Sequence, residues 1–188
     1  MKIRRTASAL LISVCCLLLT ACPPDGGDLV PLPQDGATIS STTIKDDTLR
    51  VEHHGVAITA RGVWSVSDSY TTITTEVSNE SENAVVINFD ECELMNESSQ
   101  QKLKLRAVAE YGAGGSWNYI AERVVTTNPH QRRKFDLGFL IEAQDGRASV
   151  SRDVRGQKLR LLIPVQINAA VPDRSDFIFA FIYGEHSQ

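Results

Sequence analysis

From about residue 38 onward, apolar and polar residues alternate in short runs rich in valine, isoleucine, threonine and aromatic residues. Asparagine, aspartate, glycine and serine break these runs at short intervals, which is typical of antiparallel strands joined by turns. No segment shows a convincing helical stripe with caps. The pattern predicts an all-β protein with strands over residues 49–53, 56–60, 70–77, 85–89, 102–108, 117–125, 133–139, 158–167 and 177–183.

About eight to ten short strands in one domain predict an antiparallel two-sheet sandwich, immunoglobulin-like in the broad sense, over residues 37–188. The preceding residues 22–36 differ in composition, because about half of them are proline or glycine and they show no hydrophobic periodicity. They are predicted to form a flexible tether, with a reach of about 50 Å when fully extended.

Three segments of the predicted domain, residues 55–59, 76–90 and 135–139, resemble the immunoglobulin-like accessory domain of many small bacterial lipoproteins. The resemblance covers about half of the chain that follows the leader. Members of that group mostly act as scaffolds or interaction domains, so the resemblance implies a fold and a role in contacts, and no reaction.

The first 21 residues have the pattern of a secretory signal peptide. A basic start (Lys2, Arg4 and Arg5) is followed by an uncharged, mostly apolar run over residues 6–21. As a helix this run would rise only about 24 Å, which is less than the hydrocarbon core of a bilayer. We therefore expect it to be removed from the mature protein rather than to remain as a span.

The leader ends in Leu19-Thr20-Ala21-Cys22, which resembles the lipobox of bacterial lipoproteins. The resemblance implies that Leu19, Thr20 and Ala21 are recognised, that cleavage precedes Cys22, and that Cys22 is lipidated. The next residue, Pro23, is not the aspartate that resembles an inner-membrane retention signal, so an outer-membrane anchor facing the periplasm is favoured. The alternative is an ordinary signal peptide that ends in a chance cysteine.

Charge narrows the range of partners. Removal of residues 1–21 takes away three of the 19 Lys+Arg residues and none of the 23 Asp+Glu residues, which leaves 16 against 23, a formal charge of −7. This balance argues against nucleic acid and against electrostatic docking on anionic lipid. Attachment to the membrane is therefore expected to come from acyl chains on Cys22.

Cys92 is the one cysteine that neither leaves with the leader nor carries the predicted lipid. It has no internal disulfide partner in the mature chain. We expect it to be a small buried hydrophobe, and the flanking carboxylates of Asp90, Glu91 and Glu93 to disfavour a thiolate. The alternative is a reactive or intermolecular thiol.

No catalytic residue, cofactor or metal ligand is assigned from the sequence, because no recognised nucleophile motif or fixed ligand spacing occurs. If His53 and His54 lie in a strand, they point to opposite faces and cannot both reach one ion. A copper-type site would then need His130, His186, Cys92 or Met95 from other strands. A periplasmic metal-handling lipoprotein and a hydrolase with an unrecognised site remain alternatives.

The glycine-rich segment 111–119 carries three aromatic residues, of which Tyr111 and Trp117 are candidates for a contact surface. The basic residues Arg132 and Arg133 are candidate steering charges for a partner. The alternative is a hairpin whose aromatic residues pack in the core. The sequence thus predicts a non-enzymatic, lipid-anchored envelope protein that contacts an envelope protein or a glycan.

Overall fold

A computed structural model of the protein describes residues 26–33, 41–65, 70–140 and 155–184. The predicted signal and anchor residues Leu19, Thr20, Ala21 and Cys22 lie outside these ranges, so their roles stay predictions. Within the described ranges, no helix is long and apolar enough to cross a membrane. The elements are β1 (Gly26–Pro31), β2 (Ser41–Lys45), β3 (Thr48–His53), β4 (Val56–Ser65), β5 (Tyr70–Asn79), β6 (Val85–Asn88), the short 3-10 helix η1 (Phe89–Glu91), β7 (Glu93–Asn96), β8 (Gln101–Tyr111), β9 (Trp117–Tyr119), β10 (Val124–Thr127), β11 (Arg132–Leu140), β12 (Lys158–Ile167) and β13 (Asp173–Tyr183).

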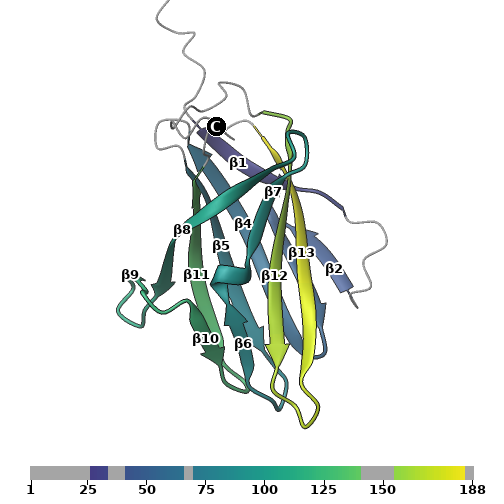
Figure 1. Ribbon diagram of the computed structural model, residues 1–188, viewed down its shortest axis with the longest axis vertical. Coiled ribbons are helices and arrows are strands. Elements are labelled where there is room, and N and C mark those ends of the chain that lie inside the picture. Colours follow the sequence, from purple (N-terminus) through teal and green to yellow (C-terminus); the bar gives the residue numbers. More distant parts are fainter. Residues whose placement is uncertain (1–25, 34–40, 66–69, 141–154, 185–188) are drawn as a thin grey trace, which may run out of the picture.

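Eight antiparallel strands close into a barrel in the order β1–β13–β12–β7–β8–β11–β5–β4, and β4 pairs again with β1 (Figure 1). The strand β1 closes the ring, because Leu29 lies opposite Tyr183 of β13 on one side and opposite Gly62 of β4 on the other. Additional strands extend the wall: β3 and β2 beyond β4, β6 and β10 beyond β12, and β9 beyond β8.

The barrel is closed by strand pairing at only one of its ends. Near that end β4 pairs with β1 through residues 62–65, whereas at the opposite end it pairs with β3 through residues 56–60. There β13 lies close to β3, but no backbone pairing joins the two strands in the part of the chain that the structure describes. This unpaired stretch is called the open seam below.

The predicted all-β class is confirmed, and the predicted two-sheet, immunoglobulin-like sandwich is wrong. Hydrophobic alternation shows which face of each strand is buried, and it is the same for a sandwich and for a barrel. The strand that closes the ring here, β1, lies in the segment predicted as a tether. The alternation therefore could not distinguish the two architectures.

Part of the predicted tether, residues 26–31, forms β1, residues 32–33 follow it outside any strand, and residues 22–25 and 34–36 lie outside the described ranges. Glycine lets β1 approach its neighbours closely. A Cβ on Gly26 would lie 2.3 Å from the carbonyl oxygen of Trp64, and one on Gly62 would lie 2.5 Å from Leu29 Cδ1. Gly26, which belongs to the segment predicted to be flexible, and Gly62 of β4 are thus both needed for barrel closure.

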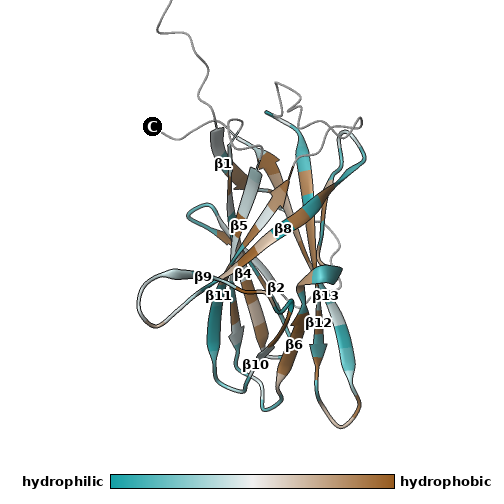
Figure 2. Cartoon of the chain, turned by 60° about the vertical axis from the view of Figure 1, so that its left-hand side comes forward, coloured by the Kyte–Doolittle hydropathy of each residue, from teal (hydrophilic) through white to brown (hydrophobic). Residues whose placement is uncertain are grey.

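The core of the barrel consists mainly of aliphatic and phenylalanine side chains. Figure 2 shows the hydrophobic residues in brown along the strands. Phe135 and Phe139 from β11 and Phe177, Phe179 and Phe181 from β13 are fully buried. The phenylalanines of β13 are two residues apart and those of β11 four apart with the buried Leu137 between them, because strand alternation directs every second side chain inward. The opposite, outward-facing residues of β5, β8 and β11 remain available for a surface site.

Candidate functional site

A hairpin formed by β8 and β9 projects from the barrel wall (Figure 1). Its turn is held by the amide of Gly112, which donates to the carbonyl of Ser116 at 2.9 Å, and by the amide of Gly115, which donates to the carbonyl of Gly112 at 3.0 Å. Gly115 has φ +75°, a left-handed conformation that favours glycine. The predicted glycine-rich break is therefore an ordered turn that sets β9 beside β8.

The register of this hairpin places Tyr111 directly opposite Trp117. Their rings form an edge-to-face pair with centroids 5.2 Å apart, and the Lys134 ammonium lies 5.4 Å and 5.7 Å from the two centroids. Both aromatic side chains are substantially exposed, at 45% and 40%. The interpretation that these rings pack in the core is thus wrong, and a surface position is confirmed.

The two arginines predicted as steering charges do not join the aromatic pair. The guanidinium of Arg133 donates to both carboxylate oxygens of Glu110, at 2.7 Å and 2.8 Å, and its side chain is three-quarters buried. Arg132 is exposed and lies 3.4 Å from Glu80. Because neighbouring residues of a strand point to opposite faces, Lys134 rather than Arg133 lies with the aromatic rings.

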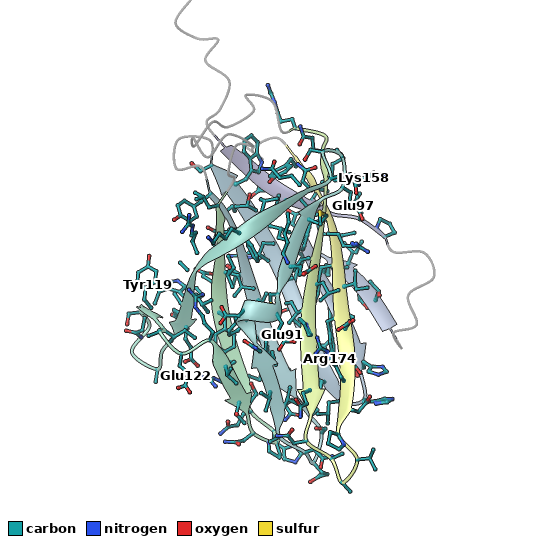
Figure 3. All side chains as sticks on the ribbon, viewed as in Figure 1. Glu91, Glu97, Tyr119, Glu122, Lys158 and Arg174 are labelled. Carbon is teal, nitrogen blue, oxygen red and sulfur yellow. The ribbon has the colours of Figure 1, made fainter. Side chains whose placement is uncertain are left out.

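A groove of about 590 Å³ runs along the outer face of β5, β11 and β8 as far as β9. Its aromatic side chains are Tyr70, Trp117 and Tyr119, and Tyr119 is 85% exposed and points away from the barrel (Figure 3). The other residues that line it are Thr72, Ala107, Ala109, Asp136 and Gly138. The groove thus has aromatic walls, two polar groups and room left by small residues.

Polar groups in the groove are held in place by contacts within the sheet. The hydroxyl of Thr74 donates to Asp136 Oδ1 at 2.5 Å, which fixes the carboxylate on the outer face of β11. The arrangement can stack flat apolar rings and accept hydrogen bonds at the same time. Sequence reasoning missed Tyr70, Lys134 and Asp136, because each is adjacent to the hairpin only through strand pairing.

The acidic residues around Cys92 make ion pairs on the barrel surface. Glu91 of η1 lies 2.9 Å from Arg174 of β13 (Figure 3), and Glu93 lies 2.5 Å from Lys102. The predicted burial of Cys92 is confirmed, since 5% of the residue is exposed. Burial, reinforced by the nearby Glu91 and Asp90 carboxylates, raises the pKa of the Cys92 thiol to about 12.

The expectation that His53 and His54 point to opposite faces is wrong. His53 ends β3, but His54 lies in the turn with φ +49°, and Gly55 follows with φ +75°. Two consecutive left-handed residues form the type of two-residue hairpin turn that fits the twist of β-strands. The turn breaks the strand alternation, and the two imidazole rings stack with centroids 3.8 Å apart.

The other residues considered for a copper-type site do not join this pair. His130 lies 3.6 Å from Glu82, Cys92 is buried, Met95 lies on β7, and His186 is outside the described residues. The adjacent group is instead Asp173 at the start of β13.

No protein-family model and no curated protein matches the chain.

Proposed function

We propose that this protein is a lipid-anchored protein of the bacterial envelope that binds an uncharged glycan in the groove beside Trp117 and Tyr119. The observation that carries the proposal is the exposed Tyr119 ring beside Trp117 and the Asp136 carboxylate in one groove. Sugar rings present an apolar face and a rim of hydroxyl groups. Aromatic rings stack on the apolar face, and fixed carboxylate or hydroxyl oxygens accept hydrogen bonds from the hydroxyl groups.

Protein composition supports the choice of an uncharged ligand. The chain after the predicted cleavage has a formal charge of −7, which opposes the approach of polyanionic glycans. Lys134 is the basic side chain beside the hairpin, and it already faces the Tyr111 and Trp117 rings. The exposed aromatic surface, rather than charge, is thus the main source of affinity in this proposal.

An anchor at Cys22 would keep the barrel close to the membrane. β1 begins at Gly26, so four residue spacings separate it from the proposed lipid, a reach of about 14 Å at full extension. The end of the barrel where Gly26 pairs with Ser65 would then face the lipid surface. In this orientation the groove lies on the side of the barrel, where long glycan strands can pass.

The proposal is tested by titrating the purified lipoprotein with oligosaccharides of the chitin, cellulose and starch types, and by co-sedimentation with peptidoglycan sacculi. Trp117 is the exposed reporter of intrinsic fluorescence, because Trp64 is only 6% exposed. We expect one sugar class to change the Trp117 emission. We also expect Tyr119→Ala to weaken binding about tenfold, which corresponds to about 1.4 kcal/mol.

A matched control is Val171→Ala, which removes an apolar side chain of similar exposure, 80%, between β12 and β13. This variant should bind like the unmodified protein. The glycan proposal is contradicted if none of the uncharged oligosaccharides binds, or if Tyr119→Ala and Val171→Ala behave alike. A different outcome is that no glycan binds, and that an envelope protein is pulled down with the unmodified protein but not with Trp117→Ala. This outcome would identify a protein partner instead.

A further inference from the structure

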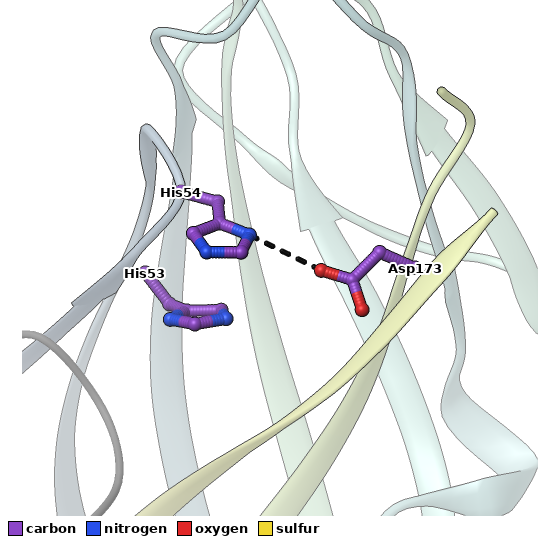
Figure 4. A group of neighbouring side chains, drawn as sticks. All are labelled: His53, His54 and Asp173. Carbon is purple, nitrogen blue, oxygen red and sulfur yellow. Dashed lines mark hydrogen bonds and ion pairs between the residues drawn. The ribbon is translucent and has the colours of Figure 1, made fainter. Parts of the chain in front are cut away.

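We infer that His53, His54 and Asp173 form a binding site for a divalent transition-metal ion at the open seam of the barrel, apart from the aromatic groove. The three side chains converge from the end of β3 with the turn that follows it, and from the start of β13 (Figure 4). One ligand atom of each residue lies within 4.8 Å of those of the other two.

The contacts in the cluster already orient two of these ligands. The Nδ1 atom of His54 lies 3.1 Å from Asp173 Oδ2, and the His54 ring is stacked on that of His53. The His54 and Asp173 side chains are 63% and 45% exposed, so an ion can reach them from solvent. The arrangement therefore offers two imidazoles and one carboxylate at an accessible position.

His53 provides a second, independent observation. Its Nδ1 atom is shielded from solvent and has no hydrogen-bond partner within the described part of the chain. Buried polar atoms in folded proteins are nearly always satisfied, and a bound ion is one way in which such an atom is satisfied. A metal ion bound by the His53 imidazole through Nδ1 would give this atom the partner that it lacks.

The chemistry of the two imidazoles and the carboxylate indicates which class of metal ion this site would bind. Imidazole nitrogen favours zinc, copper and nickel, whereas magnesium and calcium prefer sets made of oxygen ligands alone. Metal–ligand bonds of about 2.0–2.2 Å require ligand atoms about 3.3 Å apart in a tetrahedral site. The side chains must therefore turn inward on binding, which the exposed turn position of His54 allows, and water can complete the coordination.

The position of this site between β3 and β13 gives a bound ion a structural role. No backbone pairing joins β3 to β13 in the described residues, and the cluster joins the β3–β4 turn to the first residue of β13. An ion held by all three side chains would cross-link the open seam. It would also lie at the end of the barrel opposite the Gly26–Ser65 pair, and thus away from the proposed lipid anchor.

The test is a calorimetric titration of the full lipoprotein with Zn²⁺ and with Cu²⁺, using protein purified with a tag that contains no histidine. We expect one ion per chain. His54→Asn should weaken binding at least tenfold, and Asp173→Asn should also weaken it. Asparagine suits the left-handed conformation at position 54, so this variant removes the imidazole and preserves the turn.

The matched control is His130→Asn. His130 also has a left-handed conformation, with φ 58°, is exposed and lies near a carboxylate, but among the described residues it belongs to no such cluster. Binding by His130→Asn should equal that of the unmodified protein. Equal losses in His54→Asn and His130→Asn, or unchanged binding in both, would show adventitious surface binding and overturn the inference.

A spectroscopic measurement separates a coordinated site from a merely structural effect of the substitutions. The electron paramagnetic resonance spectrum of the Cu²⁺ form should show coupling to two imidazole nitrogens, and to one in His54→Asn. A spectrum without imidazole coupling in the unmodified protein would also overturn the inference.

Discussion

Replacement of Leu29 by alanine tests whether β1 is an integral part of the barrel. The Leu29 side chain is fully buried and packs against Gly62, where a Cβ would lie 2.5 Å from Leu29 Cδ1. Buried leucine-to-alanine changes cost about 3–5 kcal/mol, since both transfer free energy and cavity formation contribute. For a domain of this size, about 3 kcal/mol lowers the Tm by about 6–12 °C.

The assay is differential scanning calorimetry or urea unfolding of the purified protein, with Val30→Ala as the matched control. Val30 follows Leu29 in the same strand, but its side chain points outward and is 40% exposed. Its replacement should change stability by no more than about 0.5–1 kcal/mol. If Leu29→Ala were as stable as Val30→Ala, residues 26–31 would be a tether after all and the barrel closure would be refuted.

The lipid anchor, the two buried ionisable groups and the two neighbouring arginines can each be tested by a substitution or a pH series. Cys22→Ser should move the protein out of the membrane fraction or leave it as an uncleaved precursor, and unchanged detergent partitioning would contradict the lipid anchor. Burial raises the pKa of the Cys92 thiol and of the Tyr183 hydroxyl to about 12, from ordinary values of 9.0 and 10.0. The folded state therefore retains these protons longer than the unfolded state, so stability that is fully present below about pH 9 should fall as the pH rises toward 12. The urea concentration at the unfolding midpoint should decrease across this pH range, and the decrease should be smaller in Cys92→Ala. A midpoint that does not change with pH would refute the raised pKa values of these two groups. Arg133→Ala should lower the free energy of unfolding by about 1–3 kcal/mol, because it leaves the partly buried Glu110 carboxylate unpaired. Arg132→Ala should stay within about 0.5 kcal/mol, and equal effects in urea unfolding would contradict the pairing.

The strands with clear alternation could be predicted from the sequence. The structure forms β3, β5, β11 and β12 over nearly the predicted residues, because their inward positions are mostly apolar or, as at Thr71 and Thr75 of β5, β-branched, and their ends carry turn residues. The strand β1 could not be predicted, since its glycines and prolines resemble a linker. Its role depends on Gly62 and Gly184, which lie far away in the sequence and leave room for its side chains.

Only those residues of the candidate surface that lie close together in the sequence could be predicted. Tyr111 and Trp117 face each other because they flank one turn, and this short spacing is visible in the sequence. Lys134 and Asp136 join them through the pairing of β11 with β8, which no local pattern reveals. The histidine pair was misjudged for a different reason, because strand alternation was extended into a two-residue turn at His54-Gly55.

Glycan binding in the outer groove of the barrel can be observed residue by residue with chemical-shift mapping. Backbone and aromatic resonances of the isotope-labelled protein are followed while the sugar that binds most tightly in fluorescence is added. We expect the shifts to concentrate at Trp117, Tyr119, Ala107 and Gly138, with little change at Val171. Shifts confined to other faces of the barrel, or none at saturating sugar, would contradict it.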